Sequence, residues 1–324
     1  MSMNLREYLE TVAQKVNCEA DEYSLAVDTT LRKASSHLLI SGGKRLRPAM
    51  VLLAANIIRP SASEDIFEAA LALEWEHTFT IIHDDIMDQN TMRRGMPTVH
   101  TVFGELTAIL AGDVLNGDAF RYICRVRNTT DANKIKAVQM LAHACHELCE
   151  GQQEDMEFEI RSNVTRAEYL AMVRKKTGIL LASAAGIGAV LAGGDAKQIS
   201  ALYTFGMNAG IAFQIQDDIL DLMAPAEILG KNQASDLREN KQSFVVLTAK
   251  EKDIDLSKYY KSNLSAEEIA EAVQLLTDAG IVSECRSYAE KLIDDAKHEL
   301  SLFPDSEEKK LMAEMADFFI TRVN

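Results

Sequence analysis

Three aspartates close to one another give the sequence its most chemically informative stretch. Residues 83–95 read HDDIMDQNTMRRG, with carboxylates at Asp84, Asp85 and Asp88. On an α-helix, residues four apart lie only about 40° apart around the axis, so Asp84 and Asp88 would share one face with Asp85 beside them. Like charges on one face destabilise an isolated helix. Mg²⁺, which binds carboxylates together with substrate phosphates, would stabilise such a group.

A second acidic group has the same spacing. Residues 214–221 read QIQDDILD and carry Asp217, Asp218 and Asp221, and the preceding residues 205–216 contain no charge. One such group alone is most often a solvated surface, but a group that ends an uncharged, buried helix is poorly explained in that way. Two such helices facing each other across a cavity would need divalent cations between them. The pair therefore predicts a magnesium site.

Cations that suit phosphate oxygens lie near the first acidic group. Two arginines at 93–94 follow it, and residues 42–48 read GGKRLRP, with Lys44, Arg45 and Arg47 in four consecutive positions. Glycines let backbone N–H groups approach a phosphate at a helix start, and guanidinium groups bind phosphate through two parallel hydrogen bonds. A solvated basic loop is the alternative. In so acidic a chain we favour an anion site.

Composition limits the classes of partner. The chain has 324 residues, 47% of them apolar, and a formal net charge of -15. This charge argues against nucleic acid and anionic membrane surfaces as main partners. Two uncharged runs, 177–194 and 199–216, approach the length of a membrane span. Because they are rich in small residues and the second leads into the acidic group, we interpret them as central helices of a bundle and expect no transmembrane segment.

The elements that must position these groups are helices. Apolar residues recur at helical spacing, no strand pair is evident, and residues 98–224 contain no proline. We expect helices over 5–36, 66–88, 106–120 and much of 264–323, with a loop between Pro97 and Gly104. The prediction is an all-α protein with one domain over residues 1–324.

Five cysteines without a framework spacing, and no signal peptide, favour a reducing cytoplasm. His143, Cys145, His146 and Cys149 lie close enough in sequence to suggest zinc. The spacing of Cys145 and Cys149 also suits the packed face of a helix, which we favour because free cysteine is commonly buried.

The motifs in order resemble one family. GGKRLRP, HDDIMDQNTMRRGMPTVH, GQQEDMEFE, KTG, FQIQDDILD, and then GK and NK, spread over residues 42–241, closely resemble the trans-isoprenyl diphosphate synthases, or polyprenyl synthetases. The resemblance implies an isoprenoid-synthase-type helical bundle around a central active-site cavity, usually as a homodimer. It also implies Mg²⁺ as cofactor, and isopentenyl diphosphate and an allylic diphosphate (dimethylallyl, geranyl or farnesyl) as substrates.

The resemblance also assigns roles to residues of this chain. The metal-binding group would comprise Asp84, Asp85, Asp88, Asp217, Asp218 and Asp221. Within it, Asp84, Asp88 and Asp217 would hold three Mg²⁺ ions on the allylic diphosphate, and these three aspartates and Lys176 would be catalytic. The allylic diphosphate would contact Arg93, Lys176, Thr177, Gln214 and Lys231, and isopentenyl diphosphate would contact Lys44, Arg47, His77 and Arg94. Lys241 completes the expected substrate-binding residues.

Product length is expected to depend on a bulky residue five positions before the first aspartate. Here that residue is Phe79, followed by Thr80. This pattern is similar to short-chain synthases that make geranylgeranyl diphosphate, with farnesyl diphosphate as the alternative. Glu76 departs from the family, which usually has an apolar residue there. If its side chain faced the tail cavity, the cavity would be shorter or partly polar.

Two other functions stay open. A terpene cyclase shares the ionising chemistry but generally lacks the second aspartate motif and the GGKRLRP pocket. A catalytically silent partner subunit would tend to lose aspartates or basic residues, and none is missing here. Linear product formed without a partner protein would separate both from a synthase.

Overall fold

The computed structural model of the protein describes residues 3–161, 163–224 and 233–321. The described elements of the first half are α1 (Leu5–Leu25), α2 (Thr30–Ser36), α3 (Leu46–Ile58), α4 (Ala62–Asp65), α5 (Phe67–Met87), β1 (Met92–Arg93), β2 (Met96–Pro97), α6 (Val99–Phe103), α7 (Glu105–Arg125) and α8 (Asp131–Ile160). Those of the second half are α9 (Arg166–Val173), η1 (Arg174–Gly178), α10 (Ile179–Leu191), α11 (Ala196–Met223), α13 (Ser235–Arg238), α14 (Phe244–Glu251), η2 (Ser257–Tyr259), α15 (Ala266–Asp278), α16 (Ile281–Glu299), η3 (Leu300–Leu302) and α17 (Glu307–Thr321).

The chain forms two compact units. Unit 1 contains Met1–Cys145, Ser183–Tyr203 and Leu302–Met312, and unit 2 contains His146–Ala182, Thr204–Ser301 and Ala313–Asn324. Four of the boundaries fall inside α8, α10, α11 and α17, and the fifth falls in the short η3, whereas domains usually separate in exposed linkers. The expectation of a single domain stays a prediction.

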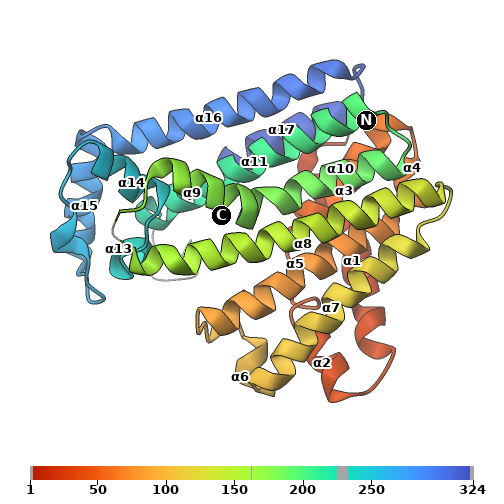
Figure 1. The fold of residues 1–324 in the computed structure, drawn as a ribbon, viewed down its shortest axis with the longest axis horizontal. Helices are drawn as coiled ribbons and strands as arrows, with labels where there is room; N and C mark the ends of the chain where they lie inside the picture. Colours follow the sequence, from red (N-terminus) through yellow and green to blue (C-terminus); the bar gives the residue numbers. More distant parts are fainter. Residues whose placement is uncertain (1–2, 162, 225–232, 322–324) are drawn as a thin grey trace. The chain divides into compact units, whose positions relative to one another are not determined.

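The core of unit 1 surrounds α5. This helix packs against α3 and α7, and Figure 1 shows α5 and α7 side by side. Trp75 of α5 is fully buried, and its ring lies 5.5 Å from that of Tyr23 and 5.3 Å from that of Tyr122, both edge-on. Edge-to-face aromatic pairs add about 0.5–1.5 kcal/mol each beyond the area they bury. This packing holds the helix that ends in the first acidic group.

Local sequence explains where several helices begin. The side chains of Asn4, before α1, and Thr165, before α9, accept hydrogen bonds from the backbone N–H three residues later. The side chains of those later residues, Glu7 and Glu168, accept hydrogen bonds from the backbone N–H of Asn4 and Thr165 in return. Each is a capping box, which satisfies two N–H groups that lack partners within the helix. The start of α3 is different, because Arg45 takes a left-handed conformation with φ 48°.

Most of the expected elements are confirmed, and two details were wrong. The expected helix over 66–88 is α5, and that over 106–120 lies within α7. Residues 97–104 are not only a loop, because α6 occupies Val99–Phe103, and Met92–Arg93 pair antiparallel with Met96–Pro97. Every residue of α10 is buried, as expected for a central helix. In the part of the chain that the structure describes, no helix is both long enough and apolar enough to cross a bilayer.

Candidate active site

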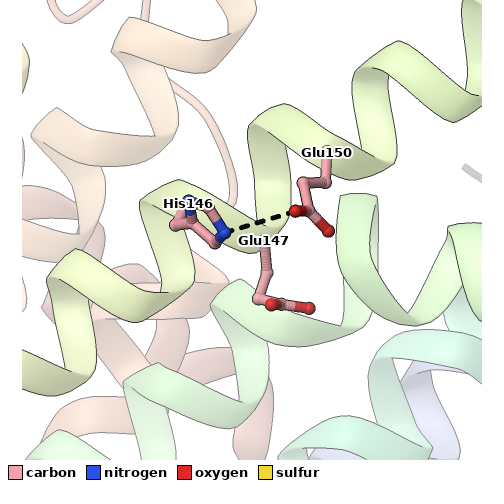
Figure 2. Close-up of side chains that lie close together, drawn as sticks. All are labelled: His146, Glu147 and Glu150. Atoms are coloured by element: carbon pink, nitrogen blue, oxygen red, sulfur yellow. Dashed lines mark ion pairs between the residues drawn. The ribbon is translucent and has the colours of Figure 1, made fainter.

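One compact group of metal-type ligands lies on α8, in unit 2 (Figure 2). The ligand atoms of His146, Glu147 and Glu150 lie within 4.8 Å of one another, and His146 is 3.3 Å from Glu150. Lys175 Nζ already pairs with Glu150 at 3.0 Å, and the two outer residues of the group are exposed. The group is therefore explained as a surface ion-pair network. Among the described residues it is the only group of its kind, so no cysteine takes part in one. Cys149 is exposed, which contradicts the packed face expected for it.

The first acidic group ends α5, in unit 1, and its members differ in burial. Asp84 is half-buried, Asp88 is exposed, and Asp85 is 1% exposed. One carboxylate oxygen of Asp85 accepts hydrogen bonds from Arg93 Nε at 3.0 Å and Arg93 Nη2 at 2.5 Å, and from Asn90 Nδ2 at 3.3 Å. Asp85 is thus engaged with donors of the protein, whereas Asp84 and Asp88 lie nearer to solvent.

A tight hairpin places the two arginines that follow. Arg94 and Gly95 both have positive φ, 53° and 76°, as the two-residue turn between β1 and β2 requires. The turn directs Arg93 to Asp85, and Arg94 Nη1 donates to the carbonyl of Gly42 at 2.5 Å. The hairpin therefore connects the acidic end of α5 with the glycine turn before α3.

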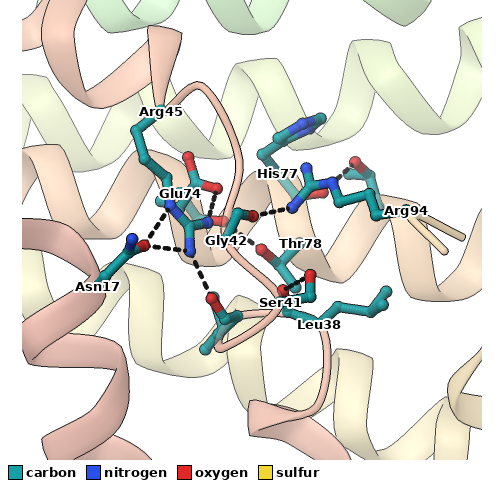
Figure 3. A network of polar contacts seen from close by, with 11 residues as sticks. Asn17, Leu38, Ser41, Gly42, Arg45, Glu74, His77, Thr78 and Arg94 are labelled. Carbon is teal, nitrogen blue, oxygen red and sulfur yellow. Dashed lines mark hydrogen bonds and ion pairs between the residues drawn. The ribbon is translucent and has the colours of Figure 1, made fainter. Parts of the chain in front are cut away.

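A buried arginine organises that glycine turn (Figure 3). The side chain of Arg45 donates to Asn17 Oδ1 at 2.9 Å, to the carbonyl of Leu39 and to Glu74 Oε1. The Arg45–Glu74 pair is almost completely buried, and removing one partner of such a pair is strongly destabilising. The sequence showed Arg45 as a cation but gave no sign of this role, because Asn17 and Glu74 lie far away along the chain.

The neighbouring cations have few compensating charges. Nε of Arg47 is buried and has no hydrogen-bond partner among the described residues. Burial, together with the nearby Arg94, lowers the pKa of Arg47 to about 10, although Glu74 opposes this. Burial and the surrounding arginines also hold the pKa of His77 well below its ordinary value, so its imidazole is neutral at neutral pH. The structure thus brings Arg47, His77 and Arg94 together, and Lys44 is exposed on the same turn.

The expected chain-length residues lie one turn before Asp84. Phe79 is buried and its ring lies 4.9 Å from the ring of His83, and Thr80 Oγ1 donates to the carbonyl of His77 at 2.8 Å. Glu76 is fully buried, and neither of its carboxylate oxygens has a hydrogen-bond partner among the described residues. Burial raises the pKa of Glu76 to about 7, and Cys145 acts in the opposite direction.

The second acidic group ends α11, in unit 2. Asp217 is half-buried, whereas Asp218 is buried and accepts hydrogen bonds from Tyr169 Oη at 2.5 Å, Phe244 N at 2.8 Å and Gln214 Nε2 at 3.1 Å. Burial raises the pKa of Asp218 to about 7, against the effect of these donors. Tyr169 was missed by the sequence analysis, which had no signal for it in an ordinary amphipathic helix.

Asp221 holds the start of α13. Its carboxylate accepts from the hydroxyl of Ser235 and from the backbone N–H of Asp236 at 3.0 Å. Lys241, a few residues later, pairs with Glu239 at 3.1 Å. Lys231, which was expected to contact the allylic diphosphate, lies outside the described residues.

The remaining expected residues lie on η1 and α11. Lys176 Nζ is 2.6 Å from Asp155 Oδ2 of α8, and Thr177 Oγ1 donates to Gln214 Oε1 at 3.1 Å. Gln214 in turn donates to Asp218, so Thr177 is connected with the second acidic group. Asp84 and Asp217 belong to different units, and the facing of the two acidic helices stays a prediction.

Comparisons with known proteins agree with these motifs. Residues 28–276 match the family model for polyprenyl synthetases. The chain is 42% identical over 323 residues to the geranylgeranyl diphosphate synthase of Methanosarcina mazei, covering 99% of both, and 42% identical over 307 residues to the geranylfarnesyl diphosphate synthase of Natronomonas pharaonis, covering 90% of both. The solved geranylgeranyl pyrophosphate synthetase of Geoglobus acetivorans superimposes with a TM-score of 0.91 at 40% identity, covering 98% of this chain and 100% of that one. The chain belongs to the polyprenyl synthetase family.

Proposed function

We propose that the protein is a prenyltransferase that condenses isopentenyl diphosphate head-to-tail with an allylic diphosphate. The observation that carries this proposal is the buried Nε of Arg47, which has no partner among the described residues. Glu74, the acid that acts on Arg47, already accepts a hydrogen bond from Arg45. Because a buried donor without an acceptor costs about 1–3 kcal/mol, an anionic ligand is the natural partner. Lys44, Arg47, His77 and Arg94 would hold the diphosphate of isopentenyl diphosphate.

The half-buried and exposed aspartates fit a magnesium site. Asp84, Asp88 and Asp217 offer hard oxygen ligands that are open to solvent, and this suits an ion that keeps several waters. When bound, Mg²⁺ would neutralise the allylic diphosphate and make it a better leaving group. Asp85, Asp218 and Asp221 would support these ligands from inside the protein, since their carboxylates accept hydrogen bonds from Arg93, Tyr169 and Ser235 respectively.

The cations of unit 2 would bind the departing pyrophosphate. The oxygen between carbon and phosphorus gains negative charge as the allylic C–O bond breaks. The ammonium of Lys176 would therefore stabilise the transition state more than the bound ester, and so would the hydroxyl of Thr177 after it turns from Gln214 to donate to the phosphate. Asp155 holds that ammonium in place, and Gln214 holds the hydroxyl. Arg93, Lys231 and Lys241 stay proposed contacts of the allylic diphosphate.

The electron pair of the broken C–O bond leaves with pyrophosphate and generates an allylic carbocation. The double bond of isopentenyl diphosphate attacks this cation and forms the new C–C bond. The attack leaves the positive charge on the isopentenyl unit. The carbon next to this charge then loses a proton to the released pyrophosphate, so no side-chain base is required. Apolar walls such as Phe79, which is buried, exclude water that would otherwise capture the cation.

Geranylgeranyl diphosphate is the proposed product, with farnesyl diphosphate as the alternative. The bulk of Phe79, one turn before Asp84, supports a short product. Relatives at equal identity are named geranylgeranyl and geranylfarnesyl synthases, so overall similarity alone does not decide the length. The proposed length therefore depends on Phe79 and Thr80.

A homodimer is also proposed, in a reducing cytoplasm. Large apolar side chains are exposed along α6 and α7, at Val102 (48%), Leu106 (80%), Ile109 (38%) and Leu110 (55%). Contiguous exposed apolar surface of this kind marks an interaction site, and most soluble oligomers are symmetric. The five free cysteines agree with a reducing compartment. Light scattering of the protein and of Leu110→Lys would test the dimer, since the charged variant should be monomeric.

Incubation of the purified protein with Mg²⁺, labelled isopentenyl diphosphate and each allylic primer tests the proposed function. A linear product made without a partner protein is expected, and its mass gives the chain length. Arg47→Ala should bind isopentenyl diphosphate much more weakly, while Arg59→Ala, which removes only a surface pair with Asp65, should match the unmodified protein. Absence of any elongated product would refute the proposal.

A further inference from the structure

The backbone that carries Lys176 and Thr177 is a π-turn. It covers Arg174–Gly178 between α9 and α10, and the N–H of Ile179 closes it by donating to the carbonyl of Arg174. π-turns are rare in proteins and occur frequently at functional sites, where they change the direction of the side chains that follow. Such a turn is less stable than a regular α-helical turn, so neighbouring structure has to hold it.

Gly151 of α8 lies directly against this turn. A Cβ atom at Gly151 would lie 2.6 Å from the backbone nitrogen of Lys176 and 2.9 Å from Cβ of Lys175. Both atoms belong to the backbone or adjoin it, and neither can rotate away as the end of a flexible side chain could. Glycine in a helix interior costs up to about 1 kcal/mol relative to alanine. The close approach of the π-turn supplies the reason for a glycine at this position.

A second helix contacts the same turn at backbone distance. A Cβ atom at Gly210 of α11 would lie 2.8 Å from Cα of Gly178, the last residue of the π-turn. The turn is therefore packed against α8 through Gly151 and against α11 through Gly210. Since both contacts are made by backbone atoms, a shift of the turn relative to α8 also disturbs its contact with α11.

The same part of α8 fixes the lysine side chain. Asp155 Oδ2 lies 2.6 Å from Lys176 Nζ, and Asp155 follows Gly151 by four residues, about one helical turn. One face of α8 thus contacts both the backbone nitrogen and the ammonium of Lys176. Small displacements between the two helices would move the lysine backbone and its charge together.

We propose that Gly151 is a positioning residue for prenyl transfer. Its missing side chain lets α8 lie against the π-turn, and this contact sets where the Lys176 ammonium and the Thr177 hydroxyl meet the allylic diphosphate. The inference rests on the proposed function, because it takes these two groups as ligands of that diphosphate. Misplacement of a binding group by about 1 Å can cost about 100-fold in rate.

Gly151→Ala tests this, with Gly117→Ala as the matched control. Gly117 also lies inside a long helix, but it is exposed and a Cβ atom there would have nothing within 4 Å. Gly151→Ala should lower kcat and raise the KM for the allylic substrate, each by about 10-fold or more, and leave the KM for isopentenyl diphosphate within about 2-fold. Gly117→Ala should match the unmodified enzyme in all three constants.

Hydrogen exchange gives a measurement that does not depend on activity. Peptides covering residues 174–179 should exchange faster in Gly151→Ala than in Gly117→Ala, since the strained turn opens more often. If Gly151→Ala fails to fold, Asp155→Ala replaces it, because it removes the acceptor of the Lys176 ammonium without adding an atom to the helix contact. This variant should raise the KM for the allylic substrate selectively.

The outcomes separate the two proposals. Absence of prenyl transfer by the unmodified protein would overturn the proposed function. With that transfer intact, equal exchange and equal kinetic constants in Gly151→Ala and Gly117→Ala would overturn the role of Gly151 alone. If Asp155→Ala is the variant used, an unchanged KM for the allylic substrate would show that α8 does not place Lys176 for this substrate, and the proposed role of Gly151, which acts through that placement, would be overturned as well.

Discussion

The buried carboxyl of Glu76 predicts a pH-dependent loss of stability. Burial raises its pKa from the ordinary value of 4.5 to about 7. Between these pH values the folded protein keeps a proton that the unfolded chain has released, so stability must fall as pH rises through this interval. At about 1.4 kcal/mol for each pH unit, the difference corresponds to about 3 kcal/mol, lost between about pH 4.5 and 7 and constant above.

Glu76→Gln isolates this effect. Glutamine has nearly the same shape and does not titrate, so the free energy of unfolding of the variant should lack this fall. Urea unfolding followed by circular dichroism, at pH 5 and pH 8 and at one fixed protein concentration, gives both values for each protein. Between the two pH values, the unmodified protein should lose about 2–3 kcal/mol more than the variant.

Glu159→Gln provides the control, because Glu159 is exposed near the end of α8. An exposed carboxyl group is in water in both the folded and the unfolded chain, so this variant should follow the unmodified protein at both pH values. If Glu76→Gln also followed it to within about 0.5 kcal/mol, the carboxyl group would have to be ionised or hydrated inside the fold. Burial would then not keep the proton on Glu76.

Four further predictions concern the site. Asp84→Ala and Asp217→Ala should each lower turnover by about 100-fold or more with unchanged circular dichroism, as loss of a charge-stabilising ligand does. Phe79→Ala should lengthen the product, measured by mass, because it removes the bulky side chain that is proposed to limit the growing chain. Lys44→Ala should raise the KM for isopentenyl diphosphate more than that for the primer in steady-state kinetics. Chelation of divalent ions should abolish product formation, and added Mg²⁺ should restore it.

The helical spacing of apolar residues predicts most of the long helices. The apolar spacing over 66–88 predicts α5 to within a residue at each end. Many side chains of this helix are buried, so apolar residues have to recur with the helical period of 3.6 residues along its whole length. The short helix between Pro97 and Gly104 could not be predicted from the sequence. Both residues are turn formers, and a five-residue helix between them leaves no periodic pattern to detect. The two-residue strands are too short to show alternation.

The spacing of charged residues predicts which residues form the candidate site, but it does not distinguish the contacts that each of them makes. Spacing makes Asp217, Asp218 and Asp221 look alike, yet Asp218 accepts three hydrogen bonds and Asp221 holds the start of α13. The difference comes from Tyr169, which is distant in sequence and becomes a partner only through tertiary packing. The sequence shows which groups carry charge, whereas long-range contacts decide which of these groups form hydrogen bonds within the protein.

The two acidic motifs share one design at the level of single residues. In each doublet the second aspartate is buried and accepts hydrogen bonds from the protein, Asp85 from Arg93 and Asp218 from Tyr169. Consecutive residues lie about 100° apart on a helix, so an inward second aspartate turns the first toward the edge of the buried face. Asp84 and Asp217 are accordingly half-buried. Replacement of Asp84 or Asp217 is therefore expected to weaken magnesium binding directly. Replacement of Asp85 or Asp218 is expected to disturb first the packing that orients the aspartate before it.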